Sequence, residues 1–470
     1  MHTSPVKEVT SSKPSSVRVS ACTILLQVAQ RQGHADDLVH KEQDRHAFPE
    51  LDRGLLMELV LGTLRQQGAL DAHITPHVTQ PFVSLEPIVQ ILLRLGAHQI
   101  LNLDRIPAHA AVHETVNAAQ LLAPRATGLI NAVLRSLVRQ TTPTPLPDRH
   151  QSPKEWLAAT LSLPIWLAEE WIAQIGLDEA AALAAMINHP PKLTVRKTTH
   201  VSHEQFLKVL ADHNIPASPC YYAPDGYTIH HRGAVQSLPG YREGWFTVQD
   251  EAAQLVSLVV APQANERLLD MCAAPGGKTV HLAELGNGTL TIVATDNKKR
   301  RMKGLEETIQ RLRLSGVTCH VVDALSPDYL KNQFFDRILL DAPCSGLGVL
   351  QRNPEAKWFL TPSDVQRCQE RQRGLLAVAA HHLRPGGVLV YATCSTSRQE
   401  NEDVLHDFLS QNNDFMIDTN LAVDPRLQSL VTTEGFIRLW PHRHGTDGFF
   451  AAKLLKRHTE EGVAPREVTA

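Results

Sequence analysis

Long hydrophobic runs are missing from this 470-residue sequence. No stretch approaches the roughly 20 consecutive apolar residues that a membrane-spanning helix needs, so we expect no membrane partner. Residues 1–16 are rich in Ser, Thr, Lys and Pro and hold no apolar run, which predicts a disordered tail and no signal peptide. We expect a second disordered tail at residues 458–470.

Cysteines with metal-binding spacing are missing as well. The seven cysteines form no CxxC pair and no Cys/His grouping with zinc spacing, so we expect no metal site. With an odd number of cysteines and no secretion signal, a reducing, cytoplasmic location is the expected one. A monomer is the expected state.

An excess of positive charge is missing too. The formal net charge of -3 does not indicate a nucleic-acid binder, because phosphate contacts need Lys and Arg. Local charge matters more than the sum, however, and one segment is basic. We interpret it either as a nucleic-acid-facing surface or as a solvated helix face. Its basic residues are Lys298, Lys299, Arg300, Arg301, Lys303, Arg311 and Arg313.

The sequence does contain enough apolar residues, 43%, for real cores, and its length suggests two to four domains. In Ala21–Val28, Leu55–Leu64 and Ile88–Leu95 apolar residues recur at three- and four-residue spacing. This spacing predicts an all-α bundle over residues 17–140. The polar, proline-rich residues 141–153 are expected to form an extended linker.

A small α/β module is predicted over residues 154–245. Its expected helices cover Trp156–Ile175, Ala180–Ile187 and Glu204–Asp212, and its clearest strand is Lys192–Thr198.

From residue 246 to residue 457, strands alternate with helices. This alternation predicts an α/β domain with a parallel, doubly wound sheet. Ligands of such sheets bind at the carboxyl ends of the strands, so the residues that follow each strand are candidate site residues. The expected strands are Leu268–Met271, Thr291–Thr295, Val317–Val322, Arg337–Leu340 and Val388–Ala392.

Three of these strand ends predict a site for an adenosine-containing cofactor. Asp296 ends the second strand at the spacing where an acidic residue binds ribose hydroxyls, and Asp323 follows the third strand, where it could bind an adenine amino group. Each aspartate alone is more often a cap or a turn residue. A small-residue loop, which lets a ligand approach the backbone closely, follows the first strand. Its residues are Cys272, Ala273, Ala274, Pro275, Gly276, Gly277 and Lys278.

The fourth and fifth strands each run into a cysteine. Asp341 comes three residues before Cys344, and Cys394 follows the fifth strand. A lone buried cysteine is usually a packing residue, but two at neighbouring strand ends indicate reactive thiols.

Two thiols and an acid suit methylation of cytosine at C5. A thiolate that adds to C6 makes C5 electron-rich, so that C5 can attack a sulfonium methyl group. Asp341 could act as the acid near N3. A second thiol or its activated water could then remove the C5 proton. Spacing alone does not settle which cysteine attacks. If the nucleophile is the cysteine that directly follows a proline, it is Cys344.

The motifs resemble the NOL1/NOP2/Sun family of RNA 5-methylcytosine methyltransferases over about Phe246–Lys456. The similar segments are CAAPGGK at Cys272–Lys278, DAPCSG at Asp341–Gly346, ATCS at Ala392–Ser395, QENE at Gln399–Glu402 and DGFFAAKL at Asp447–Leu454. Upstream, Leu129–Arg135 (LINAVLR) resembles the signature of a NusB-like helical RNA-binding domain.

The resemblance implies a Rossmann-like, S-adenosyl-L-methionine-dependent catalytic domain that acts on 16S ribosomal RNA. It implies that Cys394 is the nucleophile and that Cys344 assists product release. The methyl donor would lie on Cys272–Lys278, Asp296, Asp323 and Asp341.

Three alternatives remain open. One is a tRNA 5-methylcytosine methyltransferase, which the NusB-like segment argues against. Another is a non-catalytic RNA-binding assembly factor, which the two aligned thiols argue against. The third is that the NusB-like region, which is not basic, serves as a scaffold and not as an RNA-binding domain. RNA is expected to pass along the segment after Cys344, with Arg352, Asn353, Lys357 and Trp358 as candidate lining residues. For Trp358 the alternative interpretation, a core residue, is the more frequent one.

Overall fold

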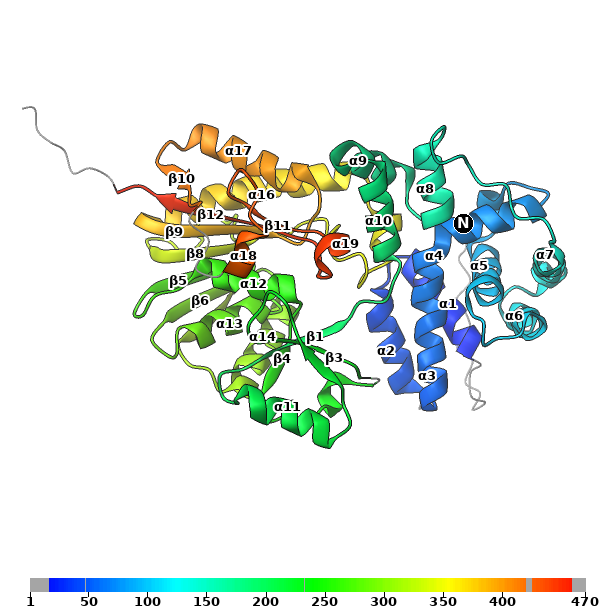
Figure 1. The fold of residues 1–470 in the computed structure, drawn as a ribbon, viewed down its shortest axis with the longest axis horizontal. Helices are drawn as coiled ribbons and strands as arrows, with labels where there is room; N and C mark the ends of the chain where they lie inside the picture. Colours follow the sequence, from blue (N-terminus) through cyan, green and yellow to red (C-terminus); the bar gives the residue numbers. More distant parts are fainter. Residues whose placement is uncertain (1–16, 47, 232, 420–424, 459–470) are drawn as a thin grey trace, which may run out of the picture. The chain divides into compact units, whose positions relative to one another are not determined.

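The computed structural model describes residues 17–46, 48–231, 233–419 and 425–458. The predicted tails at 1–16 and 458–470 lie outside these residues, apart from His458. The chain forms two compact units (Figure 1). Of the described residues, the first unit contains those up to His189 and the segment Asn353–Phe359. The second contains those from Pro190 to Arg352 and from Leu360 onward.

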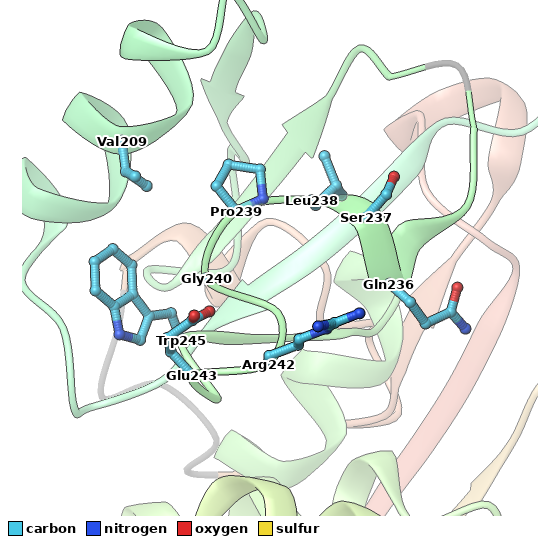
Figure 2. Close-up of a pocket in the computed structure, with 9 residues that line it drawn as sticks. All are labelled: Val209, Gln236, Ser237, Leu238, Pro239, Gly240, Arg242, Glu243 and Trp245. Atoms are coloured by element: carbon cyan, nitrogen blue, oxygen red, sulfur yellow. The ribbon is translucent and has the colours of Figure 1, made fainter.

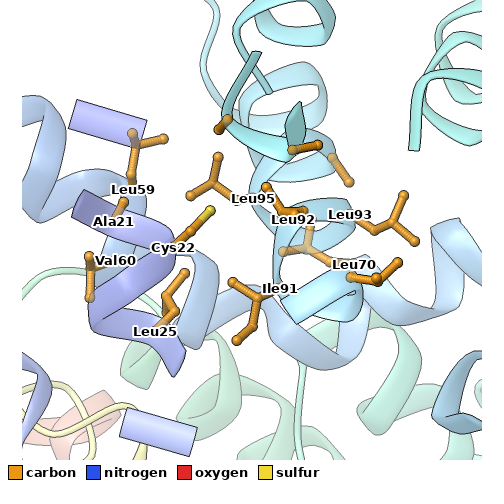
Figure 3. Packing of buried hydrophobic residues seen from close by; sticks show 14 of the residues in the cluster. Ala21, Cys22, Leu25, Leu59, Val60, Leu70, Ile91, Leu92, Leu93 and Leu95 are labelled. Atoms are coloured by element: carbon orange, nitrogen blue, oxygen red, sulfur yellow. The ribbon is translucent and has the colours of Figure 1, made fainter. Parts of the chain in front are cut away.

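The first unit is helical, which confirms the predicted bundle. Leu59, Leu92 and Leu95 are fully buried in its core (Figure 3). Cys22 lies in the same core, where burial raises the pKa of its thiol to about 12, as for a packing cysteine. Among the described residues, no helix combines the length and the apolarity needed to cross a bilayer. The α-helices are α1 (Val17–Ala29), α2 (Ala35–Arg45), α3 (Glu50–Met57), α4 (Thr63–Ile74), α5 (Pro87–Asn102), α6 (Ala108–Leu122), α7 (Thr127–Arg139), α8 (Pro153–Leu161), α9 (Ile165–Ile175), α10 (Leu177–Ile187) and the short α15 (Ala356–Phe359).

The helix expected over Trp156–Ile175 is two helices, so that prediction is wrong. Ser162 ends α8 in a left-handed conformation with φ of 58°, and Pro164 precedes α9. The Ser162 hydroxyl accepts a hydrogen bond from the Gly68 amide on α4 at 2.8 Å. Helices α8–α10 therefore belong to the first unit, whereas the strands of the predicted α/β module belong to the second.

The small module in the second unit is a four-stranded antiparallel sheet with one helix. The strand order is β2-β3-β1-β4, and Phe206 on the helix packs against Tyr227 and Phe246. Ser202 caps the helix in a capping box. The elements are β1 (Leu193–Lys197), α11 (His203–Asp212), β2 (Ala217–Pro219), β3 (Gly226–Ile229) and β4 (Phe246–Val248).

A cavity of about 400 Å³ opens in this module, between Val209 on α11 and the loop that leads into β4 (Figure 2). Trp245 and Arg242 are among its lining residues. None of the residues predicted to form the catalytic or cofactor site lines it.

The large sheet of the second unit contains the five predicted strands, all mutually parallel where they pair. Its order is β10-β12-β9-β8-β5-β6-β7, and β11 pairs with β12. The strands are β5 (Arg267–Met271), β6 (Thr291–Asp296), β7 (Val317–Val321), β8 (Phe335–Asp341), β9 (Leu383–Thr393), β10 (Phe415–Ile417), β11 (Ile437–Leu439) and β12 (Phe449–Lys456).

The expectation of a wholly parallel sheet is wrong at one edge. Strand β12 runs antiparallel to β9, β10 and β11, so the sheet is mixed. The motif that contains β12 was recognised only by resemblance, and its continuous apolar run was not interpreted as a strand. A mixed edge on a parallel sheet is a common arrangement.

Helices cover both faces of the sheet (Figure 1). Side chains of β9 alternate between the faces, with Tyr391 in the core that contains α16 and Val390 in the core that contains α12. The doubly wound prediction is thus confirmed. The flanking helices are α12 (Glu251–Val260), α13 (Gly277–Leu285), α14 (Lys299–Leu312), α16 (Pro362–His382) and α17 (Glu402–Gln411).

Candidate active site

The two predicted thiols lie in contact. Asp341, the last residue of β8, pairs in register with Ala392 on β9, so the chain leaves both strands at the same edge of the sheet. Cys344 and Cys394 follow at this edge, and their sulfur atoms are 3.3 Å apart. Both side chains are partly exposed.

Both sulfurs face a cavity of about 380 Å³ at the carboxyl ends of the parallel strands. Of the predicted cofactor residues, Cys272, Ala274, Asp296, Asp323 and Asp341 line it. Ala273, Pro275, Gly276, Gly277 and Lys278 do not line it. The remaining lining residues are Thr295, Asn297, Lys298, Arg301, Val322, Ala324, Ala342, Pro343, Arg371 and Leu375.

The loop after β5 has the tight backbone that its sequence predicts. Cys272 has a φ of 61°, and Gly276 has a φ of 106° at the start of α13. A Cβ atom on Gly276 would lie 2.3 Å from Leu305 on α14, so glycine is required both by conformation and by space.

Asp296 holds this loop in place. One carboxylate oxygen accepts a hydrogen bond from the Ala274 amide at 3.3 Å, and the other accepts one from the Lys298 amide at 2.7 Å. Asp296 is buried, whereas Asp323 is exposed at the cavity rim and accepts a hydrogen bond from the Leu325 amide.

Lys278 extends from α13 to Asp341, one of the residues that line the cavity. Its ammonium group lies 2.6 Å from the Asp341 carboxylate, and both side chains are largely shielded. Burial is the largest single influence and lowers the pKa of Lys278, but the charge and the hydrogen bond of Asp341, together with the charges of Cys394 and Asp270, outweigh it, so the pKa is raised overall. This lysine was predicted as a cofactor residue, and the structure makes it the ionic partner of Asp341.

The surroundings of Cys344 favour its protonated form. The hydrogen bond to Cys394, burial, and the charges of Cys394 and Glu400 together raise the pKa of the Cys344 thiol well above its usual range. Cys272, the third cysteine of the cavity, has its pKa raised to about 12 by burial.

Glu400 and Asn401 were overlooked as site residues, although the QENE motif that contains them was noted. Glu400 accepts hydrogen bonds from Ser345 and Ser395, the residues that follow the two cysteines. The Asn401 amide donates to the Ser395 carbonyl at 2.9 Å and so braces the Cys394 loop. The QENE motif was the only sequence feature that pointed to Glu400 and Asn401, and it did not predict what their side chains contact.

The expected RNA path along the segment after Cys344 is wrong for Lys357, whereas Trp358 has the packing role that was its alternative interpretation. Lys357 is 1% exposed and donates to the carbonyl of Arg65 and the side chain of Asn188, both in the helical unit. Trp358 donates to the Leu64 carbonyl there.

Arg352 is also committed to structural contacts. Its guanidinium pairs with Asp250 at 2.9 Å and with Asp447 at 2.7 Å.

The basic segment divides between two roles. Lys298 and Arg301 line the cavity rim, and Lys299, Arg300 and Lys303 are exposed beside them. Arg311, in contrast, is structural, because its guanidinium donates to the carbonyls of Tyr241 and Phe246 and stacks on the Tyr241 ring. The described residues contain no group of His, Cys, Asp and Glu that could hold a metal ion.

Three family matches cover most of the chain. Residues 257–455 match the family described as 16S rRNA methyltransferase RsmB/F. Residues 15–139 match the NusB family, and residues 163–236 match the ferredoxin-like domain of RsmF/B-like methyltransferases. The predicted NusB-like bundle and the predicted small α/β module are thereby confirmed.

Curated relatives match over nearly their whole length. The probable ribosomal RNA small subunit methyltransferase B of Bacillus subtilis is 34% identical over 95% of this chain and 100% of the relative. The ribosomal RNA small subunit methyltransferase B of Vibrio cholerae is 36% identical over 94% of this chain and 98% of the relative.

Solved structures show the same architecture. The crystal structure of PH0851 is 28% identical, with a TM-score of 0.80 over 95% of this chain and 99% of that chain. NSun6 from Pyrococcus horikoshii, at 24% identity and a TM-score of 0.56 over 63% of this chain and 99% of that chain, shares the fold. On the identity and coverage of these relatives, the chain belongs to the RsmB/F family of 16S rRNA methyltransferases.

Proposed function

We propose that this protein transfers a methyl group from S-adenosyl-L-methionine to C5 of a cytosine in 16S ribosomal RNA, with Cys394 as covalent nucleophile. The observation that carries the proposal is the contact of the Cys344 and Cys394 sulfurs, 3.3 Å apart on the wall of one cavity. The names of the curated relatives support ribosomal RNA as the substrate.

The cavity suits the methyl donor in size and chemistry. Its volume of about 380 Å³ is within the usual range for small-molecule sites. Asp296 and Asp323 bring carboxylate acceptors to successive strand ends, as ribose hydroxyls and amino groups require. When bound, the donor supplies an electrophilic methyl group on a sulfonium centre.

Cys394 is the sulfur best placed to attack. The charge of the Lys278 ammonium interacts with the Cys394 sulfur, and the Cys344 sulfur lies 3.3 Å from it. Cys272 is unsuited because its pKa of about 12 keeps it protonated. The Cys394 sulfur bonds to C6, the electrons of the C5–C6 double bond move to C5, and C5 takes the methyl group.

Asp341 and Lys278 supply the acid. Because the two side chains share a hydrogen bond at 2.6 Å, a proton is available on this pair for N3 of the base during attack. The base must be unstacked from its RNA strand to reach this pair.

Cys344 is suited to the second half of the reaction. The interactions with Cys394 are two of the causes that raise its pKa, and they are lost once the Cys394 sulfur is bonded to C6. Cys344 therefore becomes more acidic only after attack. It can then release its own proton to water and, as a thiolate, take the C5 proton directly or through water, as the electrons of the C5–H bond re-form the C5–C6 double bond and the bond between Cys394 and C6 breaks.

Two variants test these roles. With labelled methyl donor and unmethylated 16S RNA, Cys394→Ala is expected to lose methyl transfer and covalent capture of RNA. Cys344→Ala is expected to capture RNA but to release it slowly, which leaves an adduct that survives denaturation. Gel mobility under denaturing conditions measures the adduct.

Cys319→Ala is the matched control, because Cys319 lies on β7 and does not line the cavity. It should methylate at the wild-type rate. An adduct formed by Cys394→Ala would reject the assignment of the nucleophile. Label at any position other than C5 of a cytosine would reject the reaction itself.

Competition separates the remaining alternatives. A tRNA methyltransferase would prefer unmodified tRNA over 16S RNA when both are supplied. A non-catalytic assembly factor would bind RNA but transfer no label, and its binding would not depend on either thiol.

A further inference from the structure

A buried carboxylate joins the loop that carries Cys344 to the loop that carries Cys394. The side chain of Glu400 is 0% exposed. Its Oε1 accepts hydrogen bonds from the Ser345 amide at 2.7 Å and from the Gln372 side chain at 3.1 Å. Its Oε2 accepts from the hydroxyls of Ser345 and Ser395. Because these serines directly follow the two cysteines, one carboxylate holds the neighbour of each sulfur.

We propose that Glu400 is a positioning residue that binds the two cysteine loops together and so fixes the contact between the Cys344 and Cys394 sulfurs. This proposal deepens the function proposed above and rests on the roles given there to the two thiols.

The surroundings of Glu400 favour this role over that of an ion-pair partner. Removing a carboxylate from water is unfavourable unless its oxygens receive hydrogen bonds. The donors from Ser345, Ser395 and Gln372 are all uncharged, and they come from three different elements. The two serine hydroxyls lie only 3.2 Å apart, so the carboxylate closes a compact network directly behind the sulfurs.

A second bond ties the same segment to the sheet. The Tyr391 hydroxyl on β9 donates to the Glu400 carbonyl. The backbone of Glu400 is thus fixed to the strand that ends at the Cys394 loop, while its side chain reaches the Cys344 loop. Loss of the carboxylate should let the Cys344 loop move independently.

The distance between the sulfurs can be tested without RNA. Diamide removes two electrons and two protons from a pair of thiols, which become a disulfide while diamide is reduced to the hydrazine. Thiols in contact react faster than thiols that must first meet. The rate of Cys344–Cys394 disulfide formation, followed by mass spectrometry of the linked peptides, therefore reports the sulfur contact in the free enzyme.

Two variants at position 400 separate the contribution of the hydrogen-bonding side chain from that of its negative charge. Glu400→Ala is expected to form the disulfide at least about tenfold more slowly than wild type. Glu400→Gln should form it at close to the wild-type rate. Its amide oxygen can accept from Ser345 and Gln372, and its NH₂ group can donate to the two serine hydroxyl oxygens.

Folded Glu400→Ala protein that forms the disulfide at the wild-type rate would overturn the proposal. The proposal would also be overturned by a folded Glu400→Gln protein that forms the disulfide as slowly as Glu400→Ala does. If Glu400→Ala does not fold, the double variant Ser345→Ala/Ser395→Ala decides, since it removes the hydroxyl donors and keeps the carboxylate. Slow disulfide formation in the double variant supports the proposal, and disulfide formation at the wild-type rate contradicts it.

Failure of the proposed reaction would look different. A wild-type enzyme that forms the disulfide rapidly but transfers no methyl group to cytosine would reject the proposed function and leave the positioning result intact. In an active enzyme, Glu400→Ala should lower the turnover number, with little change in the affinity for the methyl donor.

Discussion

At the scale of single residues, one acidic group lies in an unusual place. Asp270 on β5 is 1% exposed, and burial raises the pKa of its carboxyl to about 7. One of its oxygens accepts a hydrogen bond from Thr279 on α13 at 2.6 Å. The other has no hydrogen-bond partner among the described residues.

Asp270→Asn is therefore expected to stabilise the protein at neutral and higher pH. The unfolded chain releases this proton near pH 4, whereas the folded protein keeps it up to about pH 7. The wild type thus loses stability relative to the variant as the pH rises from about 4 to about 7. The full difference is on the order of 4 kcal/mol. Urea unfolding of both proteins from pH 4 to pH 8 measures it, and a constant difference would contradict the expectation.

The residue scale also shows what sequence can predict about a site. The two cysteines and the acid were identifiable because each lies at the end of a strand or within three residues of it, and the ends of parallel strands meet at one edge. The ionic partner of Lys278, Asp341, could not be predicted, because it depends on which way α13 turns its first residues. Glu400 could not be assigned a role, because its contacts depend on the loop geometry of three separate segments.

At the scale of elements, the Cys394 loop depends on a close crossing of two glycines. The Gly348 amide donates to the Cys394 carbonyl at 2.9 Å, and the Gly448 amide donates to the Gly348 carbonyl at 2.8 Å. A Cβ atom on Gly348 would lie 2.0 Å from the Gly448 oxygen, too close for any side chain.

Gly348→Ala is expected to push the two backbones apart and to displace the Cys394 loop. We expect at least a tenfold loss of methyl transfer at single turnover, together with slower disulfide trapping of the two thiols. Gly54→Ala on α3 is the matched control, because no atom lies within 4 Å of the added carbon and the helix favours alanine. Wild-type activity in Gly348→Ala would show that the crossing does not hold the loop.

The elements themselves were predicted unevenly. Short apolar runs bounded by turns predicted all five parallel strands, because such runs have few other interpretations between helices. The break between α8 and α9 was missed because apolar spacing continues across Ser162 and Pro164. Strand β12 was missed because a run buried on both faces does not alternate.

At the scale of the whole molecule, the helical unit is completed by residues from the middle of the catalytic sequence. Phe359 packs against the core of the helical unit, and Arg31 lies over its ring at 5.3 Å. Trp358 donates to the Leu64 carbonyl on α4 at 2.7 Å. Sequence periodicity could not predict this, since nothing local distinguishes a segment that folds into another unit.

Trp358→Ala is expected to destabilise the helical unit by about 2 kcal/mol, because the ring is half-buried and its removal leaves a cavity. Hydrogen exchange in α4 should then speed up by roughly 30-fold where it proceeds through opening of the unit. Leu121→Ala, at a side chain that is 74% exposed on α6, should leave exchange unchanged. Equal exchange in Trp358→Ala and wild type would mean that the segment adds nothing to this unit.

This arrangement has a consequence for synthesis on the ribosome. Chains emerge from the amino terminus, and domains generally fold as they appear. Here the bundle's own helices are complete at residue 187, yet the segment that finishes its packing, Asn353–Phe359, is translated only after β5–β8, four of the eight strands of the large sheet. The contacts of Trp358 and Phe359 with the helical unit can therefore form only after these strands have been synthesised, and a shorter nascent chain holds the helices without their last packing partners.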